Sequence, residues 1–163
     1  MNNPADPAEQ SPMMRRLYRD WRPTRLARAL NRFYGWYSAA GLPPRWMVAV
    51  TIRGRTSGHP HTTVLVMPEQ NGNQYLVSML GEGSGWVKNA RANPEATIRH
   101  GRQRSVRLVE IPPAERAPVI REYVRIAGSG RRHFPVQPGA LLSEYEAIAD
   151  RYPVFRIEPR RET

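Results

Sequence analysis

Several features that would assign this 163-residue chain to a structural class are missing from it. It contains no cysteine, which excludes disulfides, thiolate nucleophiles and thiolate metal ligands. It has no run of about 18 apolar residues, the length that a membrane-spanning helix needs. Lysine is almost absent, since Lys88 is the only lysine among 25 basic residues. Together with a length that suits one domain, these absences predict a single-domain cytoplasmic protein.

The formal net charge of +11 is the largest departure from an average composition. A positive surface favours anionic ligands, including phosphorylated cofactors. The basic residues are spread along the whole chain, which argues against a dedicated nucleic-acid-binding face. Residues 1–11 are polar and have no apolar periodicity, so they are predicted to form a disordered tail.

Hydrophobic periodicity predicts an N-terminal helical segment over residues 12–44 and a mainly β domain over residues 45–160. Apolar and basic residues alternate at helical spacing over residues 23–40. We expect this helix to pack on the sheet or on a second subunit; peripheral membrane contact is the alternative. From residue 46 the period changes to two. Strands are expected at 46–53, 62–67, 74–80, 96–100, 104–111 and 153–158, and helices at 86–92, 113–127 and 140–151.

Local turn signals predict how these strands pair. Asn71-Gly72 is a favoured hairpin dipeptide, because both central positions of that turn need a positive φ. Consecutive hairpins imply an antiparallel sheet, and six strands with helices packed outside predict a small barrel. The fold class is therefore mainly β with flanking helices, in the α+β class.

Two polar loops are candidate sites. Residues 81–85 (GEGSG) do not match the G-x-G-x-x-G dinucleotide-binding motif, because its third glycine would fall on Trp86. The loop can still offer N–H groups to an anion or a flat ring. The alternative is a loop that only connects two elements. Residues 54–58 (GRTSG) combine a guanidinium with two hydroxyls, which suits phosphate or carboxylate, although a plain hairpin turn has the same composition. His59 and His61 share one strand face, but no third ligand lies nearby and no metal site is predicted.

Three segments together resemble one known family. They are residues 54–60 (GRTSGHP) after a strand, residues 85–94 (GWVKNARANP) and residues 151–156 (RYPVFR). The first is similar to the T-x-G-R-K-[ST]-G-x-P-R element, and the second to the W-x-x-N-L-x-A-N-P helix, of the deazaflavin-dependent nitroreductases and quinone reductases. The third resembles the C-terminal strand of the quinone reductase-like branch.

This resemblance, over about residues 46–157, implies a flavin-reductase-like antiparallel split β-barrel that binds coenzyme F-420. This coenzyme is an 8-hydroxy-5-deazaflavin with a phosphorylated, glutamate-bearing tail. The implied enzyme is an oxidoreductase that transfers a hydride from the reduced coenzyme to a quinone, nitroaromatic or similar electron-poor acceptor. The alternative is a non-catalytic split-barrel protein that binds a flavin, haem or lipid. Barrels of this kind often pair, so a homodimer is a candidate assembly.

The resemblance also implies which residues meet the coenzyme. Those beside the phosphate and tail would be Arg55, Thr56, Ser57, Gly58, His61 and Thr62. Ser78, Met79 and Leu80 would line the ring, and Trp86, Val87 and Asn89 would close the site. No catalytic side chain is assigned; Tyr123, His133 and Tyr145 are candidate proton donors.

Two positions depart from the family pattern. Thr56 stands where the pattern has lysine, and His61 where it often has arginine. Attraction for the tail at neutral pH then rests largely on Arg55. FMN is therefore the alternative cofactor.

Overall fold

The structure is a computed structural model that describes residues 18–19, 22–23 and 44–160. The predicted tail over residues 1–11 lies outside the described residues, as does nearly all of the predicted helical segment over residues 12–44, including the proposed membrane-contacting stretch. Within that segment, the two short strands β1 (Tyr18–Arg19) and β2 (Arg22–Pro23) pair antiparallel.

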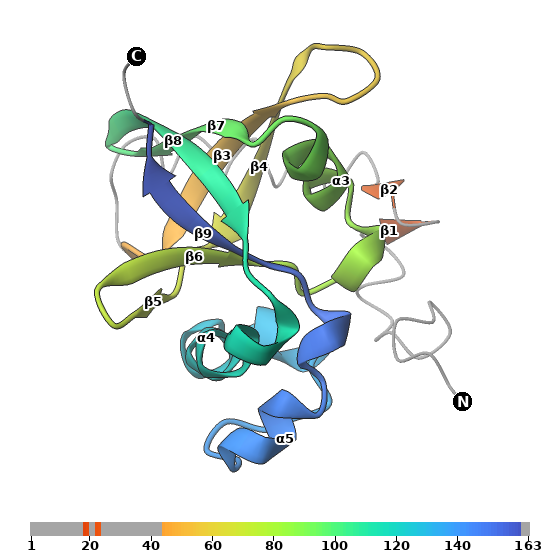
Figure 1. Ribbon diagram of the computed structural model, residues 1–163, viewed down its shortest axis with the longest axis vertical. Helices are drawn as coiled ribbons and strands as arrows, with labels where there is room; N and C mark the ends of the chain where they lie inside the picture. Colours follow the sequence, from red (N-terminus) through yellow and green to blue (C-terminus); the bar gives the residue numbers. More distant parts are fainter. Residues whose placement is uncertain (1–17, 20–21, 24–43, 161–163) are drawn as a thin grey trace.

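The domain is built on one antiparallel sheet of seven strands with the order β4-β3-β7-β8-β9-β6-β5. The strands are β3 (Met47–Arg53), β4 (Pro60–Val66), β5 (Glu69–Gln70), β6 (Asn73–Val77), β7 (Glu95–His100), β8 (Arg102–Glu110) and β9 (Val154–Pro159). The sheet curls into a half-barrel (Figure 1). This architecture confirms the predicted antiparallel split barrel with flanking helices.

The Asn71-Gly72 turn joins β5 to β6, and both residues have the expected positive φ, at 52° and 76°. The third predicted strand is shorter than expected, because β6 ends at Val77. Its longer partner is β9, the last strand of the chain, rather than the preceding β4. Hairpin signals report only neighbours in sequence, so this closure of the sheet had no local signal.

Three α-helices and three short 3₁₀ helices complete the described fold: η2 (Gly81–Gly83), α3 (Gly85–Ala92), α4 (Pro113–Ile126), η3 (Gly130–His133), α5 (Leu142–Glu146) and η4 (Ala149–Arg151). Pro113 begins α4 as predicted, since the first turn of a helix does not need its N–H. The single helix expected over residues 140–151 is divided into α5 and η4. The backbone tightens there, with Ile148 N donating to Tyr145 O and Arg151 N donating to Ile148 O, bonds that span three residues.

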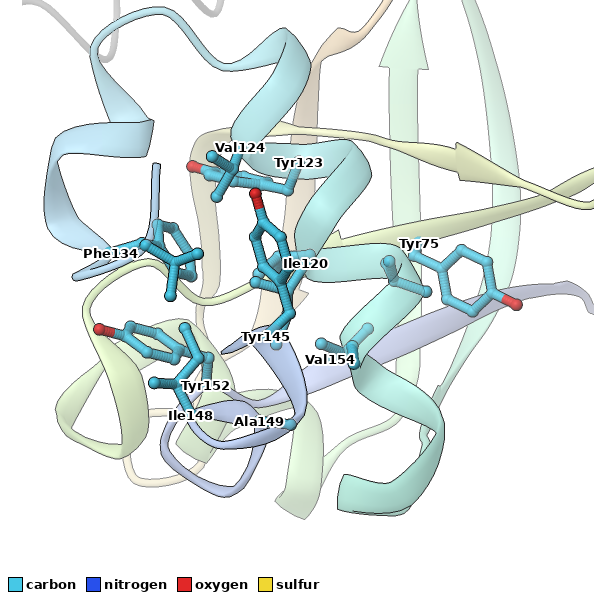
Figure 2. Close-up of a cluster of buried hydrophobic side chains, with 14 of the residues drawn as sticks. Tyr75, Ile120, Tyr123, Val124, Phe134, Tyr145, Ile148, Ala149, Tyr152 and Val154 are labelled. Atoms are coloured by element: carbon cyan, nitrogen blue, oxygen red, sulfur yellow. The ribbon is translucent and has the colours of Figure 1, made fainter. Parts of the chain in front are cut away.

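Two hydrophobic clusters lie on opposite faces of β6 and β9. On β6, Tyr75 and Val77 belong to the cluster under α4 and α5, whereas Leu76 belongs to the cluster inside the barrel. Successive strand residues point to opposite faces, so these strands separate the barrel interior from a helical layer. Figure 2 shows the helical-layer cluster, where Tyr123, Phe134, Tyr145 and Tyr152 pack around Ile120. In Figure 1, α3 lies in the upper half of the view, and α4 and α5 lie in the lower half.

Candidate cofactor-binding site

The turn between β3 and β4 is a compact loop closed by its own backbone. Gly54 N donates to His59 O at 2.8 Å, and Gly58 N donates to Gly54 O at 3.0 Å. Gly58 has a φ of 69°, a conformation that favours glycine. The remaining residues of the turn, from 55 to 59, are exposed and polar.

Helix α3 holds this turn in place through two asparagines. The Asn89 side-chain oxygen accepts a hydrogen bond from Arg55 N at 3.2 Å and a second from an Arg55 guanidinium nitrogen at 3.0 Å. The Asn93 side-chain nitrogen donates to Arg53 O at 3.3 Å. The structure thus brings together the two motifs that the sequence singled out, although Arg55 and Asn89 are 34 residues apart in the chain.

The surface around this turn is positive. Residues 51–68 contain no Asp or Glu, and Arg53, Arg55 and Lys88 are all exposed. No ion pair joins any of these three cations to another residue that the structure describes. Cations without an ion-pair partner among the described residues can bind an anionic ligand, and the turn adds the hydroxyl groups of Thr56 and Ser57.

The glycine-rich loop after β6 is fixed by Ser78. This residue is buried, its hydroxyl donates to Gly81 O at 2.8 Å, and its N–H donates to Pro153 O at 2.9 Å. Gly81 has a φ of 69°, and a Cβ there would lie 3.0 Å from Arg151 O. Met79 and Leu80 between them are half-buried. The loop is therefore held by contacts with the chain near η4.

An ion-pair network connects this loop to three other elements. Arg91 on α3 forms ion pairs with Glu82 in η2 and with Glu110 on β8, and Glu110 also pairs with Arg116 on α4. The hydrogen bond from Arg91 lowers the pKa of the Glu82 carboxyl. Hydrogen bonds to Glu110 and then Glu82 raise the pKa of Arg91. These charge-assisted hydrogen bonds fix η2 relative to α3.

Trp86 presents a flat apolar surface at the start of α3. Its ring is half-buried and tilts against Phe155, with ring centroids 5.3 Å apart. The next residue, Val87, is fully buried in the barrel interior. Helix α3 is thus anchored by Val87 and Ala90, while the exposed part of Trp86 lies on the same short helix as Asn89.

A family model for F420H(2)-dependent quinone reductase matches residues 27–133, well over half of the chain. The chain belongs to this family. Membership supports an F420-dependent reductase. No curated protein matches the chain at a significant level.

Solved structures share the fold of this F420H(2)-dependent quinone reductase family member. A structure described as a domain-swapped dimer is 20% identical, with a TM-score of 0.52, over 82% of this chain and 96% of the other. The protein Atu2129 of unknown function from Agrobacterium tumefaciens is 12% identical, with a TM-score of 0.53, over 82% of this chain and 55% of its own. An F420-H2 dependent reductase (FDR-A) is 27% identical, with a TM-score of 0.47, over 70% and 95% of the two chains.

The predicted site residues of this family member fall into three groups. Arg55, Thr56, Ser57 and Gly58 lie in the turn, and Asn89 lies against it. His61 and Thr62 follow on β4, where His61 Nε2 lies 3.4 Å from Ser57 Oγ and the Thr62 hydroxyl lies 2.8 Å from that of Thr51. Ser78, Met79 and Leu80 form a separate group before η2, connected to the first by α3 with Trp86 and Val87. Contact between these residues and a cofactor stays a prediction.

Several residues that organise the site were given no role in it by the sequence. Asn93 belongs to the motif over residues 85–94, but the sequence does not show that its side chain holds the turn. The pairing of Arg91 with Glu82 and Glu110 depends on the fold and has no sequence signal. Asn89 and Asn93 are four residues apart, a spacing that places both on one face of a helix. This spacing is the signal that could have indicated a helix face directed at the turn.

The three candidate proton donors lie in the helical layer. Tyr123 on α4 and Tyr145 on α5 are buried there (Figure 2), and the Tyr145 hydroxyl donates to Gln137 O at 2.8 Å. Burial raises the pKa of Tyr145 and lowers the pKa of His133 in η3. Trp86 packs instead against the barrel-interior cluster, on the other face of β6 and β9. The structure therefore does not bring these three residues together with the turn.

Among the described residues, no group of three or more His, Cys, Asp or Glu side chains is arranged to hold a metal ion. No described helix has the length and apolarity needed to cross a membrane.

Proposed function

We propose that this protein transfers a hydride from reduced coenzyme F-420 to a quinone, a nitroaromatic or a similar electron-poor acceptor. Family membership supports the F420-dependent reductase activity. The observation that carries the assignment to this surface is the contact between the acid-free cationic turn and the tryptophan-bearing helix α3, made through Arg55 and Asn89. Such a pair of neighbouring surfaces fits a ligand that joins a flat ring to an anionic tail.

The residues present suit the two parts of this coenzyme. Arg53, Arg55 and Lys88 would attract the phosphate and glutamate carboxylates, because none of them forms an ion pair within the described part of the chain. Donors for hydrogen bonds to the tail would be the side chains of Thr56, Ser57, His61 and Thr62, while Gly58 shapes the turn through its N–H bond to Gly54 O. This surplus of unpaired cations compensates for the absence of a lysine at position 56.

The ring would lie between the half-buried residues Met79 and Leu80 and the exposed part of Trp86. Ser78 and Val87 are buried, so we assign them a supporting role behind this surface. When bound, the deazaflavin supplies the hydride chemistry, and the protein supplies binding, orientation and exclusion of water. This division explains how a reductase can work with few dedicated catalytic side chains.

The deciding experiment titrates the purified protein with coenzyme F-420 and with FMN, and then adds menadione or a nitroaromatic to the complex with reduced F-420. Binding of F-420 followed by oxidation of the reduced coenzyme supports the proposal. Binding without oxidation favours a non-catalytic binding protein, and tighter binding of FMN favours the alternative cofactor. Failure to bind either one contradicts the proposed function.

Arg55→Ala tests the assignment of the tail site. Loss of a charged hydrogen bond should weaken F-420 binding by about 1.5–3 kcal/mol. Arg102→Ala is the matched control. Arg102 is also exposed and forms no ion pair with another described residue. It lies opposite His100 at the end of the β7–β8 hairpin that is far from the β3–β4 turn. Equal affinities for the Arg55 variant and the unmodified protein would remove Arg55 from the site.

We also propose a homodimer as the assembly. Strand β4 is an edge of the described sheet, and edge strands leave N–H and C=O groups free for pairing with another chain. Sedimentation equilibrium should give about twice the chain mass of 18.7 kDa. A species of one chain mass at all concentrations would contradict this proposal.

A further inference from the structure

We infer that Asn89 is a positioning residue, whose side-chain oxygen orients the Arg55 guanidinium toward the anionic part of the ligand without cancelling its charge. This inference rests on the proposed function and adds a role for a residue on α3 that need not touch the ligand itself.

The geometry at Asn89 fixes Arg55 in two ways at once. One oxygen atom accepts from the Arg55 backbone N–H at 3.2 Å and from the Arg55 guanidinium at 3.0 Å. The first bond places the main chain of the turn, and the second sets the direction of the side chain. A guanidinium has five N–H donors, so donors remain for a ligand after this bond is made.

The neutral charge of the acceptor is as important as its position. A carboxylate at position 89 would also hold Arg55, but it would form an ion pair and compete with an anionic ligand for the same charge. The amide oxygen holds the guanidinium and leaves its charge unpaired. An arginine that is already ordered loses less side-chain entropy on binding, which is how preorganisation raises affinity.

Asn89 is itself held on a rigid element. Its neighbours Val87 and Ala90 on α3 are buried in the barrel interior. Its own carbonyl accepts from Asn93 N at 2.7 Å, and the Asn93 side chain binds Arg53 O. A side chain on a packed helix positions its partner more accurately than one on a free loop.

The test compares Asn89→Ala and Asn89→Asp with the unmodified protein, using two ligands in equilibrium titrations. One ligand is coenzyme F-420, and the other is its ribityl deazaflavin chromophore without the phosphate and glutamates. Asn89→Ala should weaken F-420 binding about tenfold, equivalent to about 1.4 kcal/mol. Asn89→Asp should weaken it at least as much, although it keeps the acceptor oxygen. Neither change should alter binding of the tail-less chromophore by more than about twofold.

A double variant separates positioning from a general structural role. If Asn89 acts through Arg55, the Arg55→Ala, Asn89→Ala double variant should bind F-420 no more weakly than Arg55→Ala alone. Equal losses for F-420 and the tail-less chromophore, or additive losses in the double variant, would overturn the inference. If Asn89→Ala does not fold, Asn89→Asp carries the same comparison of ligands.

The outcomes also separate this inference from the proposed function. If the unmodified protein binds F-420 and the Asn89 variants bind it equally well, the inference is wrong and the proposed function stands. If the unmodified protein binds no F-420, the proposed function is wrong and this inference falls with it.

Discussion

Gly54 is buried in the β3–β4 turn between two side chains of that turn and of β4. A Cβ at this position would lie 2.7 Å from the His61 ring and 2.9 Å from Ser57 Oγ. Both contacts are shorter than van der Waals distances, so Gly54→Ala must displace both side chains, which are exposed and can rotate away. We expect the free energy of unfolding to fall by about 1 kcal/mol, the lower end of the cost of overpacking, when it is measured by urea denaturation.

Gly128→Ala is the matched control for Gly54→Ala. Nothing lies within 4 Å of a Cβ at Gly128, and its φ is outside the left-handed region. This change should leave the free energy of unfolding within about 0.5 kcal/mol of the original value. Equal effects of the two substitutions would show that His61 and Ser57 do not confine Gly54.

At the level of single residues, sequence reasoning found both ends of the Arg55–Asn89 contact but not the contact itself. Each residue belonged to a motif that the family resemblance singled out. Their meeting, 34 residues apart, depends on how α3 packs against β3. The roles of Asn93 and Arg91 could not be predicted for the same reason, because a partner on another element is set by tertiary packing.

Helix α4 contains an internal proline that the sequence alone did not flag as costly. Pro118 lies in the middle of the helix Pro113–Ile126, where it has no N–H to donate to the carbonyl four residues earlier. Pro118→Ala should therefore raise the free energy of unfolding by about 1–3 kcal/mol, visible as a higher thermal midpoint. Pro113→Ala at the start of α4 is the control and should bring no such gain, because that position needs no donor. A lower midpoint for Pro118→Ala would show that the ring contributes packing that outweighs its backbone cost.

At the level of elements, the predictions that succeeded rested on short-range physics. The Asn71-Gly72 hairpin, the start of α4 at Pro113 and the end of α3 before Asn93-Pro94 each follow from the backbone preferences of the residues at that point. The pairing of β6 with β9 and the division of α5 from η4 do not. The first joins residues about 80 positions apart, from Tyr75 to Arg156, and the second depends on how Tyr145 and Ile148 pack under α4.

The described part of the molecule consists of a barrel and a helical layer, and Arg116 joins them. This residue is only 5% exposed. It donates to the carbonyls of Ile111 and Ala149 at 3.0 and 3.3 Å, and it pairs with Glu110 at 3.1 Å. Burial lowers the pKa of Arg116, an effect opposed by the charges of Glu110 and then Glu82. Through Glu110 and Arg91, this buried charge connects α4 and η4 with α3 and the glycine-rich loop.

Arg116→Ala should therefore destabilise both parts of the molecule together. We expect the free energy of unfolding to fall by about 1–3 kcal/mol, the cost of leaving buried acceptors without a donor, since the carbonyls of Ile111 and Ala149 lose theirs while Glu110 keeps its ion pair with Arg91. Arg107→Ala, which removes a half-exposed ion pair with Glu95, is the control and should have a much smaller effect. In hydrogen–deuterium exchange, the backbone amides of the barrel strand β3 and those of helix α4 should lose protection together. If only the α4 amides lost protection, Arg116 would stabilise the helical layer alone, and the network would not transmit its effect to the candidate site.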